Sequence, residues 1–65
     1  MKEYSNSRIA ELIDEYIHNE RDRAILKRRL IDGRTFDELS AEFSLSDSRI
    51  KTIVYRKQEK LFKHL

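Results

Sequence analysis

The 65-residue chain has no cysteine, no proline and a single glycine, Gly33. Without cysteine it can have neither a disulfide framework nor a zinc-finger ligand set. A β-rich fold needs more turn residues than one glycine supplies, so we expect an all-α protein. No apolar run approaches membrane length, and no signal-peptide pattern follows Met1. We expect one cytoplasmic domain spanning residues 1–65.

Patterns for catalysis and metal binding are also missing. The chain has no glycine-rich phosphate loop, and its acidic residues form no cleft motif. His18 and His64 are far apart and do not have a metal-ligand spacing. Short helices also enclose too little volume for a typical catalytic pocket. We therefore expect no enzymatic activity, no metal ion and no cofactor.

Residues 35–55, TFDELSAEFSLSDSRIKTIVY, have the pattern of two helices joined by a tight turn. Thr35 and Glu38 form a T-x-x-E capping box for the first helix. Ser46 is the N-cap of the second, and Asp47 suits its positive first turn. The apolar and small positions match a helix-turn-helix: Leu39, Ser40, Phe43, Leu45, Ile50 and Ile53. An ordinary pair of amphipathic helices is the alternative that caps and spacing alone leave open.

Four helices are predicted in all, over residues 7–18, 20–32, 36–43 and 47–62, with residues 1–6 frayed. Gly33 supplies a left-handed end to the second helix. Ser44 stands where the motif usually has a left-handed glycine, at a cost of about 1 kcal/mol if it adopts that conformation. We expect one shared core formed by Ile9, Leu12, Ile13, Tyr16, Ile25, Leu26, Leu39, Phe43, Leu45, Ile50 and Ile53.

Two surfaces of these helices have alternative uses. The apolar stripe of residues 9–17 suits the core better than it suits a homodimer seam, although the second use stays open. Lys57 lies near the middle of the apolar face of the last helix, so it either snorkels or lies beyond the edge of the core. We expect the second arrangement, with the end of the helix projecting past the body.

Charge is unevenly distributed although the formal net charge is only +2. Residues 1–20 and 35–45 each have a net charge of −3, whereas residues 21–34 and 46–65 each have +4. Positive charge therefore collects on the second motif helix and on the helix before the motif. This distribution indicates a polyanionic partner, and solvated helix surfaces are the plainer alternative.

The span from Arg21 to Leu65 resembles region 4 of the sigma-70 family of transcription initiation factors. The matching residues are Arg21-Asp22-Arg23-Ala24-Ile25-Leu26, Asp32-Gly33, Thr35, Glu38-Leu39 and Ser46-x-x-Arg49-Ile50-Lys51-x-Ile53. The resemblance implies that the second motif helix enters the major groove of a −35 promoter element. It also implies contact with the flap of the RNA polymerase β subunit. Because the other sigma regions are absent, we expect a small stand-alone regulator, bacterial or phage-encoded and nucleoid-associated.

The resemblance also implies which positions face the bases. They are Asp47, Ser48, Lys51 and Thr52, with Arg49 as a phosphate or base contact. The family usually has Arg and Glu at the first two positions and Gln at the fourth. It also has glycine in place of Ser44 and leucine in place of Arg28. The −35 consensus is therefore not expected as the target.

The sequence itself predicts which residues touch DNA. Since a helix advances about 100° per residue, four side chains point away from the core and toward base edges: Ser48, Lys51, Thr52 and Tyr55. The predicted contacts to the DNA backbone are Arg34, Thr35, Ser46, Arg49, Arg56 and Lys60. We expect sequence-specific binding of double-stranded DNA in transcription regulation. The alternative is a protein-interaction module that docks on RNA polymerase or forms a homodimer through its first helix.

Overall fold

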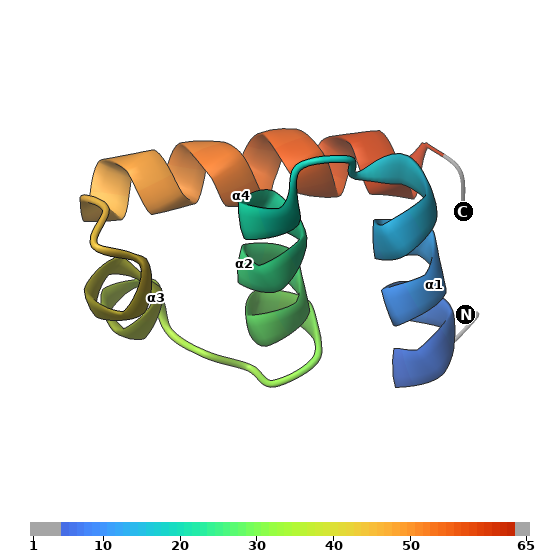
Figure 1. Ribbon diagram of the computed structural model, residues 1–65, viewed down its shortest axis with the longest axis horizontal. Coiled ribbons are helices and arrows are strands. Elements are labelled where there is room, and N and C mark those ends of the chain that lie inside the picture. The colour runs from blue at the N-terminus through green and yellow to red at the C-terminus, as the bar shows by residue number, and fades with distance from the viewer. Residues whose placement is uncertain (1–4, 64–65) are drawn as a thin grey trace.

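Four α-helices build the protein in the computed structural model, which describes residues 5–63. They are α1 (Asn6–Tyr16), α2 (Glu20–Leu30), α3 (Phe36–Phe43) and α4 (Asp47–Phe62), and the described part of the chain has no strand. Figure 1 shows α4 along the whole length of the molecule, with α1 and α2 packed across one side and α3 below its N-terminal end. The all-α, four-helix expectation is confirmed. No helix between residues 5 and 63 is long and apolar enough to cross a membrane.

Every helix begins at a polar N-cap whose side chain accepts a backbone N–H bond three residues on. These caps are Ser5, Asn19, Thr35 and Ser46, with donor–acceptor distances of 3.1, 3.1, 3.1 and 3.2 Å. The Glu38 carboxylate also accepts the Thr35 N–H at 3.1 Å, which completes the predicted capping box. The bounds of α3 and α4 match the predicted ones because their caps were readable from the sequence.

The first two helices differ from their predicted bounds. Residues 1–4 of the segment predicted to be frayed lie outside the described residues, but Ser5 caps α1 and Asn6 begins it. The helix ends at Tyr16, because Ile17 adopts an extended backbone that turns the chain toward α2. The second helix ends at Leu30, before Gly33, whose φ of 72° lets the next N–H, that of Arg34, donate to the Arg28 carbonyl at 3.0 Å.

All four helices contribute to one core. The buried apolar side chains are Leu12, Ile13, Ile17, Ile25, Leu26, Leu39, Ile50, Ile53, Val54 and Leu61. Four residues that were predicted to be in the core are only half-buried and pack against its rim: Ile9, Tyr16, Phe43 and Leu45. They lie near the ends of helices or beside the turn, where fewer neighbours cover them. The stripe on α1 therefore serves mainly the core, and little of it is left for a homodimer seam.

The prediction for Lys57 is wrong. Its ammonium group lies 3.8 Å from Oδ2 of Asp22, a carboxylate on α2 that is almost entirely buried. One turn further along α4, Leu61 is buried in the core, so the helix does not project past the body at Lys57. The apolar spacing predicted the correct face of α4, but it could not reveal that a carboxylate far away in the sequence is the partner of this lysine.

Candidate nucleic-acid interface

The turn between α3 and α4 fixes the geometry of the helix-turn-helix. Ser44 adopts the left-handed conformation that this motif usually gives to a glycine, with φ 55° and ψ 42°. Two hydrogen bonds close the turn: the Leu45 N–H donates to the Ser40 carbonyl at 3.2 Å, and the Ser40 hydroxyl donates to the Leu45 carbonyl. Leu39 of α3 and Ile50 of α4 are both fully buried in the same core, which packs α3 against α4.

Four side chains predicted to read bases share the outer side of the first half of α4. Ser48, Lys51, Thr52 and Tyr55 are all exposed, and their spacing of three, four and seven residues gives one continuous stripe. We call these four residues the reading stripe. Ile50, Ile53 and Val54 are buried on the opposite side. The structure therefore brings the predicted base contacts together on one exposed surface.

One residue of the reading stripe already uses its hydroxyl proton inside the protein. The Thr52 hydroxyl donates its proton to the Ser48 carbonyl at 2.9 Å, four residues earlier in the helix. In this geometry Thr52 offers a base an acceptor oxygen and a methyl group, but no donor. Ser48, by contrast, keeps a hydroxyl that forms no hydrogen bond with any described residue.

Phe36, the first residue of α3, is a residue of the site that the sequence did not single out. Its ring centroid lies 5.7 Å from the Lys51 ammonium and 5.9 Å from the Tyr55 ring, which meets it edge-on at 71°. The Arg29 guanidinium of α2 lies 4.3 Å from the same centroid. Two members of the reading stripe therefore contact the start of α3 in addition to their own helix.

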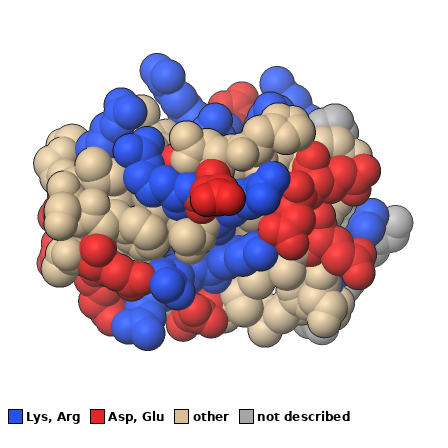
Figure 2. All heavy atoms as spheres, viewed as in Figure 1, with Lys and Arg blue, Asp and Glu red and all other residues tan. Residues whose placement is uncertain are grey.

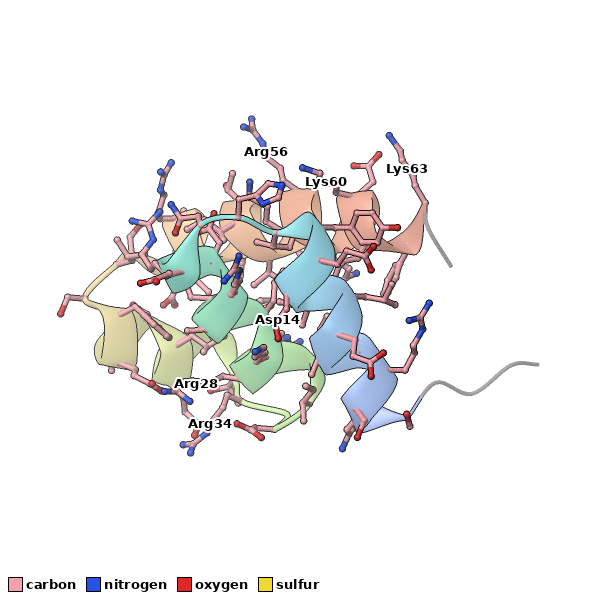
Figure 3. All side chains as sticks on the ribbon, turned by 45° about the vertical axis from the view of Figure 1, so that its right-hand side comes forward. Asp14, Arg28, Arg34, Arg56, Lys60 and Lys63 are labelled. Atoms are coloured by element: carbon pink, nitrogen blue, oxygen red, sulfur yellow. The ribbon has the colours of Figure 1, made fainter. Side chains whose placement is uncertain are left out.

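The six predicted backbone contacts are all exposed, but they do not form one patch. In Figure 3, Arg56, Lys60 and Lys63 project from α4 at the top, whereas Arg34 lies at the bottom of the view. Arg34 is also engaged, because its guanidinium pairs with Glu38 at 3.4 Å. Lys63 was missed, although its spacing of three residues from Lys60 continues the same flank of the helix.

Two of the predicted backbone contacts are N-caps as well. The Thr35 and Ser46 hydroxyl oxygens accept the N–H groups that begin α3 and α4. Each hydroxyl still has a proton to donate, and a phosphate oxygen at a helix N-terminus is a suitable acceptor. The predicted role of these two residues is therefore compatible with their capping role.

Part of the positive charge on α2 is paired with acidic side chains of neighbouring helices at the surface of the fold. Lys27 pairs with Asp14 at 2.8 Å, and Arg28 pairs with Glu42 while its guanidinium lies 5.8 Å from the Phe43 ring centroid. Arg29 donates to the Arg34 carbonyl at 2.8 Å. Two of the three cations in the basic run of α2 are therefore paired with carboxylates of other helices, and the third is bonded to a backbone carbonyl.

Positive charge on α4 is different. Among the described residues, Lys57 is the one cation of this helix and its C-cap that forms an ion pair. Besides Lys51 of the reading stripe, the unpaired cations are Arg49, Arg56, Lys60 and Lys63. We call these four residues the α4 basic flank. Figure 2 shows Lys and Arg along the upper edge of the molecule over α4, with acidic side chains gathered over α1 and near α3. Uncompensated cations beside the reading stripe make this the face that attracts a polyanion.

Two carboxylates lie at the start of the motif helices. A hydrogen bond to the Asp47 carboxyl raises the pKa of Asp37 above its usual range, and repulsion between the two charges adds to this rise, while nearby Lys51 opposes it. The pKa of the neighbouring Glu38 is lowered by the hydrogen bond from the Thr35 N–H. Asp47 is exposed at the first position of α4, and its carboxyl shares a hydrogen bond with Asp37.

The described part of the chain holds no group of three or more His, Asp or Glu side chains that could bind a metal ion together. His18 is exposed after the end of α1, and His64 lies outside the described residues.

The comparison with known families agrees with this geometry. A family model described as sigma-70, region 4 matches residues 19–63, which include all of α2, α3 and α4. No curated protein and no solved structure matches the chain. Since the match spans more than half of the sequence, this chain belongs to the sigma-70 region 4 family, whose domain is a DNA-binding helix-turn-helix that acts in transcription.

Proposed function

We propose that this protein binds double-stranded DNA sequence-specifically and regulates transcription by binding alone, without catalysis or a cofactor. One observation carries the proposal: all four residues of the reading stripe are exposed on the first half of α4, and the stripe lies beside the α4 basic flank. That combination suits a helix that enters the major groove while its flank contacts phosphates. We expect this activity in the cytoplasm, at the nucleoid of a bacterium, with the protein encoded by the bacterium or by a phage.

Base reading is assigned to the reading stripe. The Lys51 ammonium donates to guanine O6 or N7, and the Ser48 hydroxyl donates or accepts. The Thr52 methyl meets a thymine methyl, because the Thr52 hydroxyl is already bonded to the helix backbone. Tyr55, at 55% exposure, presents its ring and hydroxyl at the end of the stripe.

Backbone contacts are assigned to the two sides of α4. Arg49, Arg56 and Lys60 neutralise phosphates along one side of the groove. The residues around the starts of the motif helices, Arg34, Thr35 and Ser46, contact the backbone elsewhere. Arg34 has to exchange its pairing with Glu38 for a phosphate to do so.

Two alanine variants test this division of roles. Lys51→Ala should lose roughly 1–3 kcal/mol on a selected duplex and relax the preference at one or two base pairs. Arg56→Ala should weaken binding to all duplexes alike and lower the salt slope by about 1. Arg8→Ala is the matched control, since Arg8 is an exposed arginine on α1 that pairs with Glu11. The proposal fails if Lys51→Ala and Arg56→Ala both bind like the wild type at low salt.

We also propose RNA polymerase as a protein partner that docks at the opposite end of the molecule. An apolar cavity of about 80 Å³ lies there between α1, α2 and α4, lined by Ile9, Leu12, Leu30, Leu61 and Phe62. Phe62 is 52% exposed, which is unusual for a phenylalanine on so charged a surface. This observation favours protein docking as a second function beside DNA binding. The docking surface would then include residues of α2 and α4 as well as α1.

Binding to purified RNA polymerase tests the second function. Phe62→Glu should abolish binding to the polymerase while DNA affinity stays within about twofold, because Phe62 lies beyond the reading stripe. Lys51→Ala is the reciprocal control and should leave polymerase binding unchanged. Equal polymerase binding by the wild type and Phe62→Glu would remove this docking site.

A further inference from the structure

The Phe36 ring is a junction between three helices. It belongs to α3, it is half-buried against the core, and Arg29 of α2 covers it at 4.3 Å. Lys51 and Tyr55 of α4 approach it from the reading stripe at 5.7 and 5.9 Å. Arg29 is itself held in place, because it donates to the Arg34 carbonyl at 2.8 Å. The ring is therefore positioned from α2, and it touches half of the residues assigned to base reading.

Each of these contacts restricts a side chain that would otherwise be mobile. An exposed lysine has a flexible four-carbon stem, and ordering it on binding costs free energy. A cation near an aromatic ring is attracted by the ring quadrupole, and an edge-to-face aromatic pair is favourable beyond its buried area. These contacts favour positions of the Lys51 and Tyr55 side chains near α3 in the protein without DNA.

We propose that Phe36 is a positioning residue for base recognition, which acts by orienting Lys51 and Tyr55 and does not itself read a base. This inference rests on the proposed function, since it assigns a role within the same DNA-binding site. It predicts a specific loss: without the ring, the protein still folds and still binds DNA through phosphates. Discrimination then weakens at the base pairs that these two side chains read.

Phe43 provides a matched control on the same helix. Like Phe36 it is half-buried, packs against the core and lies close to an arginine, in this case Arg28. No ring or cation contact joins it to any member of the reading stripe. A leucine at position 36 or 43 keeps an apolar side chain in the core and removes only the ring. Of the two substitutions, Phe36→Leu removes a ring that contacts the reading stripe, whereas Phe43→Leu removes one that does not.

The test measures binding of each variant to a selected duplex and to an unrelated duplex of the same length. Phe36→Leu should bind the selected duplex about twofold to fivefold more weakly than the wild type, with the unrelated duplex unchanged. Phe36→Tyr keeps the ring and should bind like the wild type. Phe43→Leu should change both duplexes by the same factor. Repeating Phe36→Leu in a Lys51→Ala, Tyr55→Ala background should abolish its effect.

A second measurement observes the contact in the protein without DNA. Ring currents of Phe36 should shift the proton resonances of the Lys51 side-chain end, and this shift should disappear in Phe36→Leu but persist in Phe43→Leu. The inference is overturned if Phe36→Leu discriminates between the duplexes like the wild type. It is equally overturned if the full loss persists in the doubly substituted background. A wild-type protein that does not discriminate between duplexes overturns the proposed function itself.

Discussion

The carboxylate of Asp22 on α2 lies 3.8 Å from the ammonium of Lys57 on α4, and Asp22 is only 5% exposed. Arg21 approaches the other carboxylate oxygen at 3.4 Å. The pair ties the two helices that share the largest interface of the fold. A buried carboxylate has lost its water, so it depends on these two cations.

Replacing Lys57 should therefore lower the free energy of unfolding by more than replacing an unpaired lysine at the surface would. Lys57→Met leaves Asp22 buried with Arg21 alone, and we expect a loss of roughly 1–3 kcal/mol in the free energy of unfolding. Adding Asp22→Asn should recover part of this loss, because no buried charge is then left. Urea denaturation of the two single variants and the double variant gives the coupling. Strictly additive effects would show that the pair does not interact.

Ser44→Gly should stabilise the protein by about 0.5–1 kcal/mol. Ser44 has a φ of 55°, where glycine has no steric penalty and other residues do. Thermal denaturation should show a higher Tm. Ser46→Gly is a suitable comparison of opposite sign, because Ser46 has an extended backbone and its hydroxyl caps α4. A lower Tm for Ser44→Gly would mean that the Ser44 side chain makes a favourable contact.

Leu39→Ala should destabilise the domain by about 2–5 kcal/mol, which is a large part of the stability of a 65-residue protein. Leu39 is fully buried beneath α4, so the substitution leaves a cavity at the centre of the helix-turn-helix. Chemical denaturation measures the loss. Ala41→Gly, at an exposed position of the same helix, should cost only about 1 kcal/mol. If Leu39→Ala and Ala41→Gly lowered the free energy of unfolding equally, Leu39 would not be a central residue of the core.

The two acidic residues in the first turn of α3, Asp37 and Glu38, should make the stability of the fold depend on pH in opposite directions. The folded protein holds a proton on Asp37 more tightly than the unfolded chain does. Asp37 therefore adds stability below its usual pKa of 3.8, and this is lost as the pH rises through the raised value. Glu38 has a lowered pKa, so its contribution is present above 4.5 and is lost as the pH falls through the lowered value.

Asp37→Asn should accordingly make the protein more stable at neutral pH, because the repulsion with Asp47 disappears. It should also increase DNA affinity by removing a negative charge beside the reading stripe. Unfolding measured between pH 3 and 7 and binding at neutral pH check both statements. Glu15→Gln, an exposed acidic position on α1, serves as the control. Unchanged stability of Asp37→Asn at neutral pH would show that the two carboxylates do not repel each other.

Local signals made the motif predictable from the sequence. Thr35 and Ser46 are caps that act within three residues, so the starts of α3 and α4 could be read directly. The left-handed conformation of Ser44 followed from its position between the two helices. The outward direction of Lys51 and Thr52 followed from the helical period alone.

Contacts between residues that are distant in the sequence could not be predicted from these local signals. Nothing near Lys57 indicates Asp22, and nothing near Phe36 indicates Arg29 or Tyr55. The same limit explains why the sequence could not reveal the partners of Lys27, Arg28 and Arg29 in the basic run of α2. These partners lie on α1, on α3 and in the loop between α2 and α3, and only packing brings them together.

The contrast between the acidic surface of α1 and the α4 basic flank has a kinetic consequence. Exposed Glu11, Asp14 and Glu15 lie on α1, while the flank on α4 has no partner among the described residues. With DNA as the partner, such a separation turns the molecule during diffusion, so that α4 meets the duplex before α1 does. The association rate should therefore fall steeply with added salt even where the lifetime of the final complex changes little.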